Sequence, residues 1–122
     1  MSGKVISQVQ IGSDKHLISS SLYGTCSTAA GTAAKEVKLA DTNVNGFTVM
    51  TGMTLAVKFT YSNTSSTQPT LTLKTNGNVQ LLSAKNIYKY GTTKPGVTEG
   101  DSWYAGSTVL FVYDGSAWQM AN

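Results

Sequence analysis

The chain of 122 residues is long enough for one domain with a single hydrophobic core. Charged residues make up only 12% of it, against roughly 25% in an ordinary globular chain, so we expect a polar but weakly charged surface. All nine basic residues are lysine, and they are spread along the sequence. Because nucleic-acid readers use the arginine fork on guanine edges and phosphates, the lack of arginine argues against a nucleic-acid partner.

The cysteine and histidine content limits the chemistry that the chain can perform. Cys26 is the only cysteine, which excludes an intrachain disulfide, and one histidine cannot build a histidine-based metal cluster. No apolar run approaches the roughly 18 residues of a transmembrane helix, and the N-terminus lacks the apolar core of a signal peptide. We therefore expect no cofactor, no metal, no membrane insertion, and synthesis in the cytoplasm.

The first half of the chain predicts short strands. Residues 5–11 alternate apolar and polar side chains and turn at 12–14 into residues 15–18, which predicts an N-terminal hairpin. Residues 25–34 are poor in large apolar side chains, so we expect a loop there with one helical turn at most. Strands are expected at 36–40 and at 53–60. The second of these places four apolar residues on one face: Met53, Leu55, Val57 and Phe59.

The second half continues the same pattern. Strands are expected at 70–74, 79–82 and 87–90, with a hairpin turn at Asn76 and Gly77, and residues 91–101 are expected to form a loop. The chain closes on a β-branched and aromatic run that enters Asp114 and Gly115 and leaves through Trp118. Because positive backbone dihedrals cost little in an Asp-Gly pair, this predicts a tight C-terminal hairpin.

These elements predict an all-β fold with under about 15% helix. Short strands separated by turn residues are typical of an antiparallel β-sandwich, jelly-roll-like, or of a small barrel with short hairpins. We assign residues 1–18 to an N-terminal hairpin or attachment segment and residues 19–122 to a single β domain.

Candidate catalytic groups are few. His16 has no serine or cysteine partner at motif spacing, and Cys26 has no base near it in sequence, so a structural role is favoured for both. Glu99 and Asp101 are two residues apart and suit an acid–base pair on a sugar or part of a calcium site. Simple solvated charges are favoured for this pair, because calcium takes about six or more oxygen ligands. We expect the protein not to be an enzyme.

Aromatic residues gather in the last third of the chain, where they form either core or a binding platform. Tyrosine and tryptophan faces stack on sugar rings and line protein interfaces. Burial is favoured for Trp103 and Trp118, whereas both alternatives stay open for the tyrosines. A glycan site, if the chain has one, is expected among Tyr88, Tyr90, Trp103, Tyr104 and Asp101, with Asn86, Thr92 and Thr93 as hydrogen-bonding neighbours.

An ordered series of segments gives the chain a resemblance to a known class of proteins. The segments are residues 23–35 (YGTCSTAAGTAAK), 57–64 (VKFTYSNT), 69–73 (PTLTL), 90–95 (YGTTKP), 102–106 (SWYAG) and 112–118, which runs from Val-Tyr-Asp-Gly to Trp118. Together they resemble a domain of virion structural proteins in tailed phages of Gram-positive gut bacteria, found in tail-fibre, baseplate-associated and head-fibre proteins. The resemblance covers residues 18–122. Where that family often has Pro-Thr-Leu-Asn-Val-Asn, this chain has Pro-Thr-Leu-Thr-Leu-Lys at 69–74, which removes two asparagines.

The resemblance implies a virion location, reached after synthesis in the host bacterial cytoplasm without a signal peptide. It implies other virion proteins as partners and a homo-oligomer, with a trimer favoured. We expect a non-enzymatic structural module, an exposed fibre or decoration domain that binds bacterial-surface glycans. The alternative is a purely architectural capsid or baseplate attachment protein without host binding. Whether the chain belongs to the head or the tail stays open.

Overall fold

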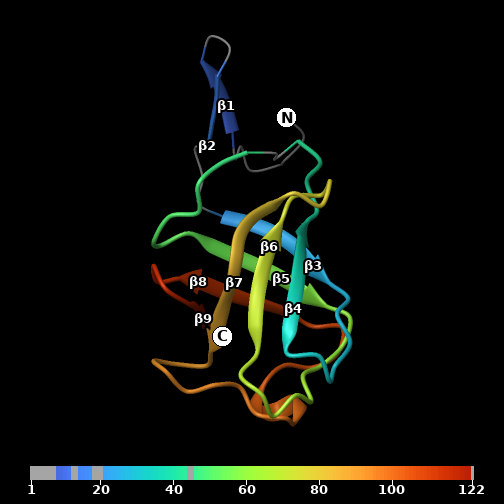
Figure 1. The fold of residues 1–122 in the computed structure, drawn as a ribbon. Helices are drawn as coiled ribbons and strands as arrows, with labels where there is room; N and C mark the ends of the chain where they lie inside the picture. Colours follow the sequence, from blue (N-terminus) through green and yellow to red (C-terminus); the bar gives the residue numbers. More distant parts are fainter. Residues whose placement is uncertain (1–7, 12–13, 18–20, 44–45, 122) are drawn as a thin grey trace.

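The computed structural model describes residues 8–11, 14–17, 21–43 and 46–121, and within these it is all β. Seven strands close into one barrel, and the first two form a separate hairpin (Figure 1). A single turn of 3-10 helix, η1 (Glu99–Asp101), is the only helical element of the described residues. The strands are β1 (Gln8–Ile11), β2 (Asp14–Leu17), β3 (Ser21–Cys26), β4 (Ala34–Leu39), β5 (Thr54–Phe59), β6 (Thr70–Lys74), β7 (Gln80–Tyr88), β8 (Thr108–Tyr113) and β9 (Trp118–Met120). The predicted all-β class, with a small barrel as one of its forms, is confirmed.

The barrel order is β3-β4-β6-β7-β9-β8-β5, with β5 returning to β3. The sheet is mixed. Antiparallel pairing, as expected from the sequence, occurs in β3/β4, β5/β8, β6/β7 and β8/β9, but β3/β5, β4/β6 and β7/β9 are parallel. The difference has a simple cause, because apolar alternation fixes which side chains face the core and not the direction of a partner strand. Each parallel pair joins strands that have another strand between them in the sequence.

Alternating side chains from the strands fill the barrel interior. Leu55 and Val57 are fully buried and Phe59 is 1% exposed, as the pattern of residues 53–60 predicted. The Trp103 ring stacks on Phe59 with centroids 4.2 Å apart, and Trp118 packs against Tyr113 at 5.1 Å. Both tryptophans are buried, so core packing, the favoured interpretation, is confirmed for them.

The strand β3 is missing from the sequence-based prediction. Its inward positions are Leu22, Gly24 and Cys26, and two of these are too small to give an apolar signal. Gly24 is needed at this position, because a Cβ would lie 2.7 Å from both the carbonyl oxygen of Lys38 and Cγ1 of Val37 on β4. The loop that follows contains a turn and no helix. The expectation of a loop across all of residues 25–34 was therefore wrong at both ends, because Thr25 and Cys26 belong to β3 and Ala34 begins β4.

The strand β7 is longer than expected, since it runs unbroken from Gln80 to Tyr88 and joins parts of the two segments predicted as separate strands at 79–82 and 87–90. It ends at Tyr88, and Tyr90 instead forms an isolated bridge with Thr93. The preceding turn is also shifted by one residue, because the positive backbone dihedral belongs to Asn78 (φ 77°) and not to Gly77.

The C-terminal hairpin is confirmed, with a different turn from the one expected. Tyr113 pairs with Trp118, so four residues form the connection, and only Gly115 has a positive φ, at 101°. Asp114 contributes its side chain: Oδ2 accepts a hydrogen bond from Gln119 and Oδ1 accepts bonds from the backbone amides of Ser116 and Ala117. These bonds lower the pKa of Asp114, because they stabilise the ionised carboxylate.

The N-terminal hairpin also agrees with the prediction where the structure describes it. β1 and β2 pair antiparallel, with Gln8 opposite Leu17 and Ile11 opposite Asp14. Asp14, expected in the turn, belongs to β2. Residues 1–7, 12–13 and 18 of this predicted hairpin lie outside the described residues.

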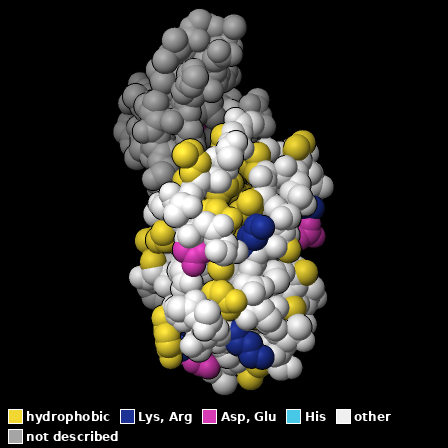
Figure 2. Space-filling view, turned by 60° about the vertical axis from the view of Figure 1, so that its left-hand side comes forward, with side chains coloured by type: hydrophobic (Ala, Val, Ile, Leu, Met, Phe, Trp, Pro, Cys, Tyr) yellow, Lys and Arg dark blue, Asp and Glu magenta, His cyan; other side chains and the backbone are white. Residues whose placement is uncertain are grey.

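The barrel surface is largely polar and uncharged, as the composition indicates. On the face seen in Figure 2, white polar side chains and backbone predominate, and charged side chains are few. Several large apolar or aromatic side chains of the described residues are nevertheless more than 45% exposed: Tyr23, Met50, Tyr61, Val79, Tyr90, Val97 and Tyr104. Two of the positions expected to bind glycan are among them.

Candidate functional site

The predicted glycan residues lie at the end of β7 and on the segment that joins it to β8. We call residues 88–107 the tyrosine loop. Tyr90 is 66% exposed and Tyr104 is 61% exposed, so both rings are available to a ligand. Tyr88 is half-buried, and its hydroxyl accepts a hydrogen bond of 2.8 Å from the side-chain amide of Asn86. Trp103 is 3% exposed and offers no face to solvent. Of the predicted aromatic residues, Tyr90 and Tyr104 thus face solvent, whereas Trp103 lies in the interior.

Trp103 and its neighbours hold the tyrosine loop in place. The indole Nε1 of Trp103 donates a hydrogen bond of 3.0 Å to the carbonyl of Tyr61. Lys89 forms an ion pair with Asp101, which ties the end of β7 to η1, and this hydrogen bond raises the pKa of Lys89. Oε2 of Glu99 accepts a bond of 3.0 Å from the backbone amide of Ala105. The two carboxylates considered as an acid–base pair therefore contact different parts of their own loop.

The turn after β7 is closed by backbone hydrogen bonds around Tyr90. The amide of Thr93 donates to the carbonyl of Tyr90 at 3.0 Å, and the amide of Lys89 donates to the carbonyl of Thr93 at 2.8 Å. Gln119 of β9 adds a side-chain bond of 2.8 Å to the carbonyl of Gly91. Tyr90 thus projects from a turn with fixed geometry, which reduces the entropy lost when a ligand orders the ring.

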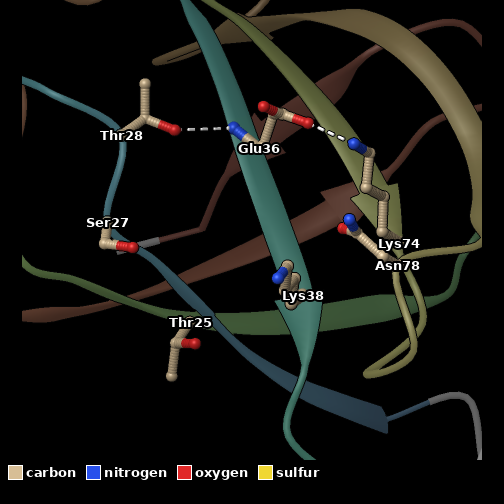
Figure 3. A pocket seen from close by; sticks show the side chains of 7 residues that line it. All are labelled: Thr25, Ser27, Thr28, Glu36, Lys38, Lys74 and Asn78. Carbon is tan, nitrogen blue, oxygen red and sulfur yellow. Dashed lines mark hydrogen bonds and ion pairs between the residues drawn. The ribbon is translucent and has the colours of Figure 1, made fainter.

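A second site, which the sequence did not indicate, lies on the outer face of the barrel. It is a cavity of about 440 Å³, open to solvent, that we call the polar groove. The residues lining it carry hydroxyl, amide, ammonium and carboxylate groups: Thr25, Ser27, Thr28, Glu36, Lys38, Lys74 and Asn78 (Figure 3). They come from the end of β3 and the loop after it, from β4, from the end of β6 and from the β6–β7 turn. The tyrosine loop contributes none of these lining residues.

The polar groove opens because β3 and β4 separate. Their pairing is confined to Gly24 with Leu39 and Thr25 with Lys38. The same register would bring Cys26 opposite Val37 and then Ser27 opposite Glu36. Instead the backbone amide of Glu36 donates a hydrogen bond of 3.0 Å to Oγ1 of Thr28 (Figure 3). A side-chain oxygen thereby replaces the missing ladder partner, which satisfies the amide while leaving space between the strands.

The loop that forms one wall of the polar groove is fastened from inside by Lys35. This lysine is 1% exposed, and its Nζ donates bonds of 3.2 Å to the carbonyls of Ala29 and Ala30. The ammonium also lies 5.9 Å from the ring centroid of Trp103. Burial lowers the pKa of Lys35, because the charged form loses its hydration. The wall is therefore held by charge-assisted bonds and a cation–π contact.

The charges of the polar groove are unbalanced. Lys38 and Lys74 are direct neighbours across the parallel β4/β6 pair, and Glu36 lies on the same outward face of β4 as Lys38. Glu36 forms an ion pair with Lys74 (Figure 3). The pKa of Glu36 is lowered, mainly by its hydrogen bond with Lys74 and also by the charge of Lys38. With Glu36 ionised, the two lysines and one carboxylate leave one positive charge.

Sequence reasoning missed the polar groove because its residues gather only through topology. The alternation of β4 does indicate that Glu36 and Lys38 face outward, and this signal was available in the sequence. However, β4 lies between β3 and β6 in the barrel. No local pattern specifies that residues 25–28 and 74–78 flank those two charges.

Within the described residues, no group of three or more histidine, cysteine, aspartate or glutamate side chains is placed to hold a metal ion. No helix in the same part of the chain is long and apolar enough to cross a membrane. No protein-family model, curated protein or solved structure matches the chain.

Proposed function

We propose that this chain is a non-enzymatic structural module of a tailed-phage virion, an exposed fibre or decoration domain that binds bacterial-surface glycans. The observation that carries the proposal is the exposure of Tyr90 and Tyr104 on a tyrosine loop held in place by Trp103 and by the Lys89–Asp101 ion pair. Flat aromatic faces on a fixed loop suit the apolar faces of sugar rings. The resemblance of residues 18–122 to virion structural proteins supports the location.

The weakly charged surface supports the same proposal. With 12% charged residues, the chain depends on apolar contacts and uncharged hydrogen bonds more than on ion pairs. Salt screens such contacts much less than it screens exposed charges. A domain with this surface keeps its structure and its binding when a particle moves between media of different ionic strength.

Assembly with other copies follows from the weakness of a single site. Two tyrosine faces on one domain give low affinity, and several copies on one particle raise it through effective concentration. We therefore propose that the chain forms a homo-oligomer, with a trimer favoured, and that it contacts other virion proteins.

A purely architectural attachment protein is the second candidate. Tyrosine is enriched at protein interfaces as well as in sugar sites, and Tyr61 and Val97, exposed to 48% and 49%, add further apolar surface. In that case the exposed rings contact capsid or baseplate proteins and the chain binds no glycan.

The double variant Tyr90→Ala/Tyr104→Ala tests the glycan site. Both rings are exposed, so we expect a melting temperature close to that of the parent and at least about tenfold weaker binding, which corresponds to about 1.4 kcal/mol. Pull-down by cell-wall preparations from Gram-positive gut bacteria measures the binding. Tyr23→Ala, at a tyrosine 46% exposed on β3, is the matched control and is expected to bind as the parent does.

The possible outcomes separate the two candidates. A folded double variant that binds as well as the parent rules out the tyrosine loop as the site. A parent that binds no cell-wall preparation favours the architectural candidate. Light scattering on the same samples measures assembly, and we expect three times the chain mass of 12.9 kDa.

A further inference from the structure

The polar groove has unused hydrogen-bonding capacity. The side chains of Thr25, Ser27 and Asn78 line it and make no hydrogen bond with any other described residue. Each carries at least one donor and one acceptor. The cavity of about 440 Å³ lies within the range of small-molecule sites, roughly 300–1,000 Å³. These features suit a ligand with several hydroxyl groups.

The lysines of the polar groove add a preference for negative charge. Like charges on directly paired residues of neighbouring strands destabilise a sheet, and Lys38 and Lys74 are such a pair. Glu36 compensates Lys74 through their ion pair. The ammonium group of Lys38 forms no hydrogen bond or ion pair with a described residue, and its charge acts on Glu36 only from a distance. An anionic group next to Lys38 would relieve the repulsion between the two ammonium groups.

The same geometry argues against a nucleic-acid strand as the occupant. The residues lining the polar groove include no aromatic side chain on which a base could stack. One of the two lysines is already paired with Glu36. A bare inorganic anion would use Lys38 and leave the hydroxyl groups of Thr25 and Ser27 and the amide group of Asn78 without partners.

We infer that the polar groove is a second binding site, separate from the tyrosine loop, for an acidic sugar unit. The carboxylate or phosphate of the sugar lies beside Lys38 and Lys74. Thr25, Ser27 and Asn78 bind its hydroxyls, and Glu36 accepts from a further hydroxyl. The hydrogen bond from Glu36 to Thr28 and the bonds of Lys35 to its loop fix the two walls before the ligand enters. This site goes beyond the proposed function and does not depend on Tyr90 or Tyr104.

Titration of the full chain with four probes, followed by amide NMR shifts, tests the inference. We expect glucuronate or glucose 1-phosphate to shift the amides of residues 25–28 and 74–78, and glucose to bind at least about tenfold more weakly. The two acidic sugars tell a carboxylate preference from a phosphate preference. Inorganic phosphate is the fourth probe, and it is expected to bind more weakly than glucose 1-phosphate.

Variants test the role of the charge. Lys38→Gln removes the ammonium from an exposed position and is expected to weaken acidic-sugar binding about tenfold or more, to the level of glucose. Lys94→Gln makes the same charge change at an exposed loop residue outside the polar groove and is expected to leave binding unchanged. Ser27→Ala, which removes a hydroxyl and no charge, provides a second variant and is expected to weaken all three sugars by a similar factor.

Several results would overturn the inference. The first two are equal affinity for glucose and glucuronate, and an affinity for phosphate as high as that for glucose 1-phosphate. The third is an equal loss of acidic-sugar affinity in Lys38→Gln and Lys94→Gln. The fourth is a set of amide shifts confined to residues outside the polar groove. The Tyr90→Ala/Tyr104→Ala variant is expected to bind glucuronate like the parent. Failure of the tyrosine-loop site and failure of the polar-groove site are therefore distinguishable.

Discussion

Replacing Trp118 with alanine is expected to lower the free energy of unfolding by about 3–5 kcal/mol. Trp118 is fully buried, and it begins β9 at the point where that strand pairs with both β7 and β8. Its ring packs against Tyr113 at a centroid distance of 5.1 Å. Alanine leaves a cavity in the core beside β7, β8 and β9. Urea unfolding followed by circular dichroism measures the loss.

Trp118→Phe is the matched control for this prediction. The indole Nε1 is buried and has no hydrogen-bond partner among the described residues. A buried donor of this kind costs about 1–3 kcal/mol, so phenylalanine keeps a ring while removing an unfavourable group. We expect a loss well below that of alanine. Equal losses in the two variants, or less than about 1 kcal/mol for alanine, would contradict the packing described for Trp118.

Replacing Gly24 with alanine is expected to lower the free energy of unfolding by about 2 kcal/mol. The added Cβ would lie 2.7 Å from the carbonyl oxygen of Lys38 and from Cγ1 of Val37, so β3 and β4 must move apart. In an unhindered strand the same change would be favourable, because alanine loses less backbone entropy than glycine. Urea unfolding midpoints measure the effect.

Gly31→Ala provides the comparison for Gly24. A Cβ at Gly31 would meet only Oγ1 of Thr64, at 3.8 Å, which is an ordinary contact. We expect a change within about 0.5 kcal/mol, as for an open surface position. If both alanine variants unfold at the same urea concentration, the close approach of β3 to β4 is not a determinant of stability.

The sequence predicts those strands of the barrel whose inward side chains are large. Leu55, Val57 and Phe59 alternate with small or polar residues, so β5 is visible in the sequence, and the aromatic run of β8 makes the C-terminal hairpin equally clear. β3 is not visible, because Gly24 and Cys26 occupy inward positions without a strong apolar signal. Small inward residues are required where another strand approaches closely.

Strand direction and the candidate sites depend on longer-range information. The parallel pairing of β3 with β5 brings together strands separated by β4, and no local residue pattern specifies it. Trp103 is buried while its neighbour Tyr104 is exposed, and no local pattern in the sequence predicts this difference. It arises because the indole of Trp103 packs against Phe59. The polar groove likewise exists because β3 and β4 separate after Thr25, a feature of three-dimensional geometry.

Immunogold labelling of purified phage particles in negative-stain images tests the central claim most directly. For this experiment an epitope tag is added at the C-terminus, because residues 1–18 are predicted to form an N-terminal hairpin or attachment segment. We predict gold on the outer surface of infectious particles, at repeated positions on either the head or the tail. Particles that lack the label, while the tagged chain is present in the infected-cell lysate, would contradict a virion role.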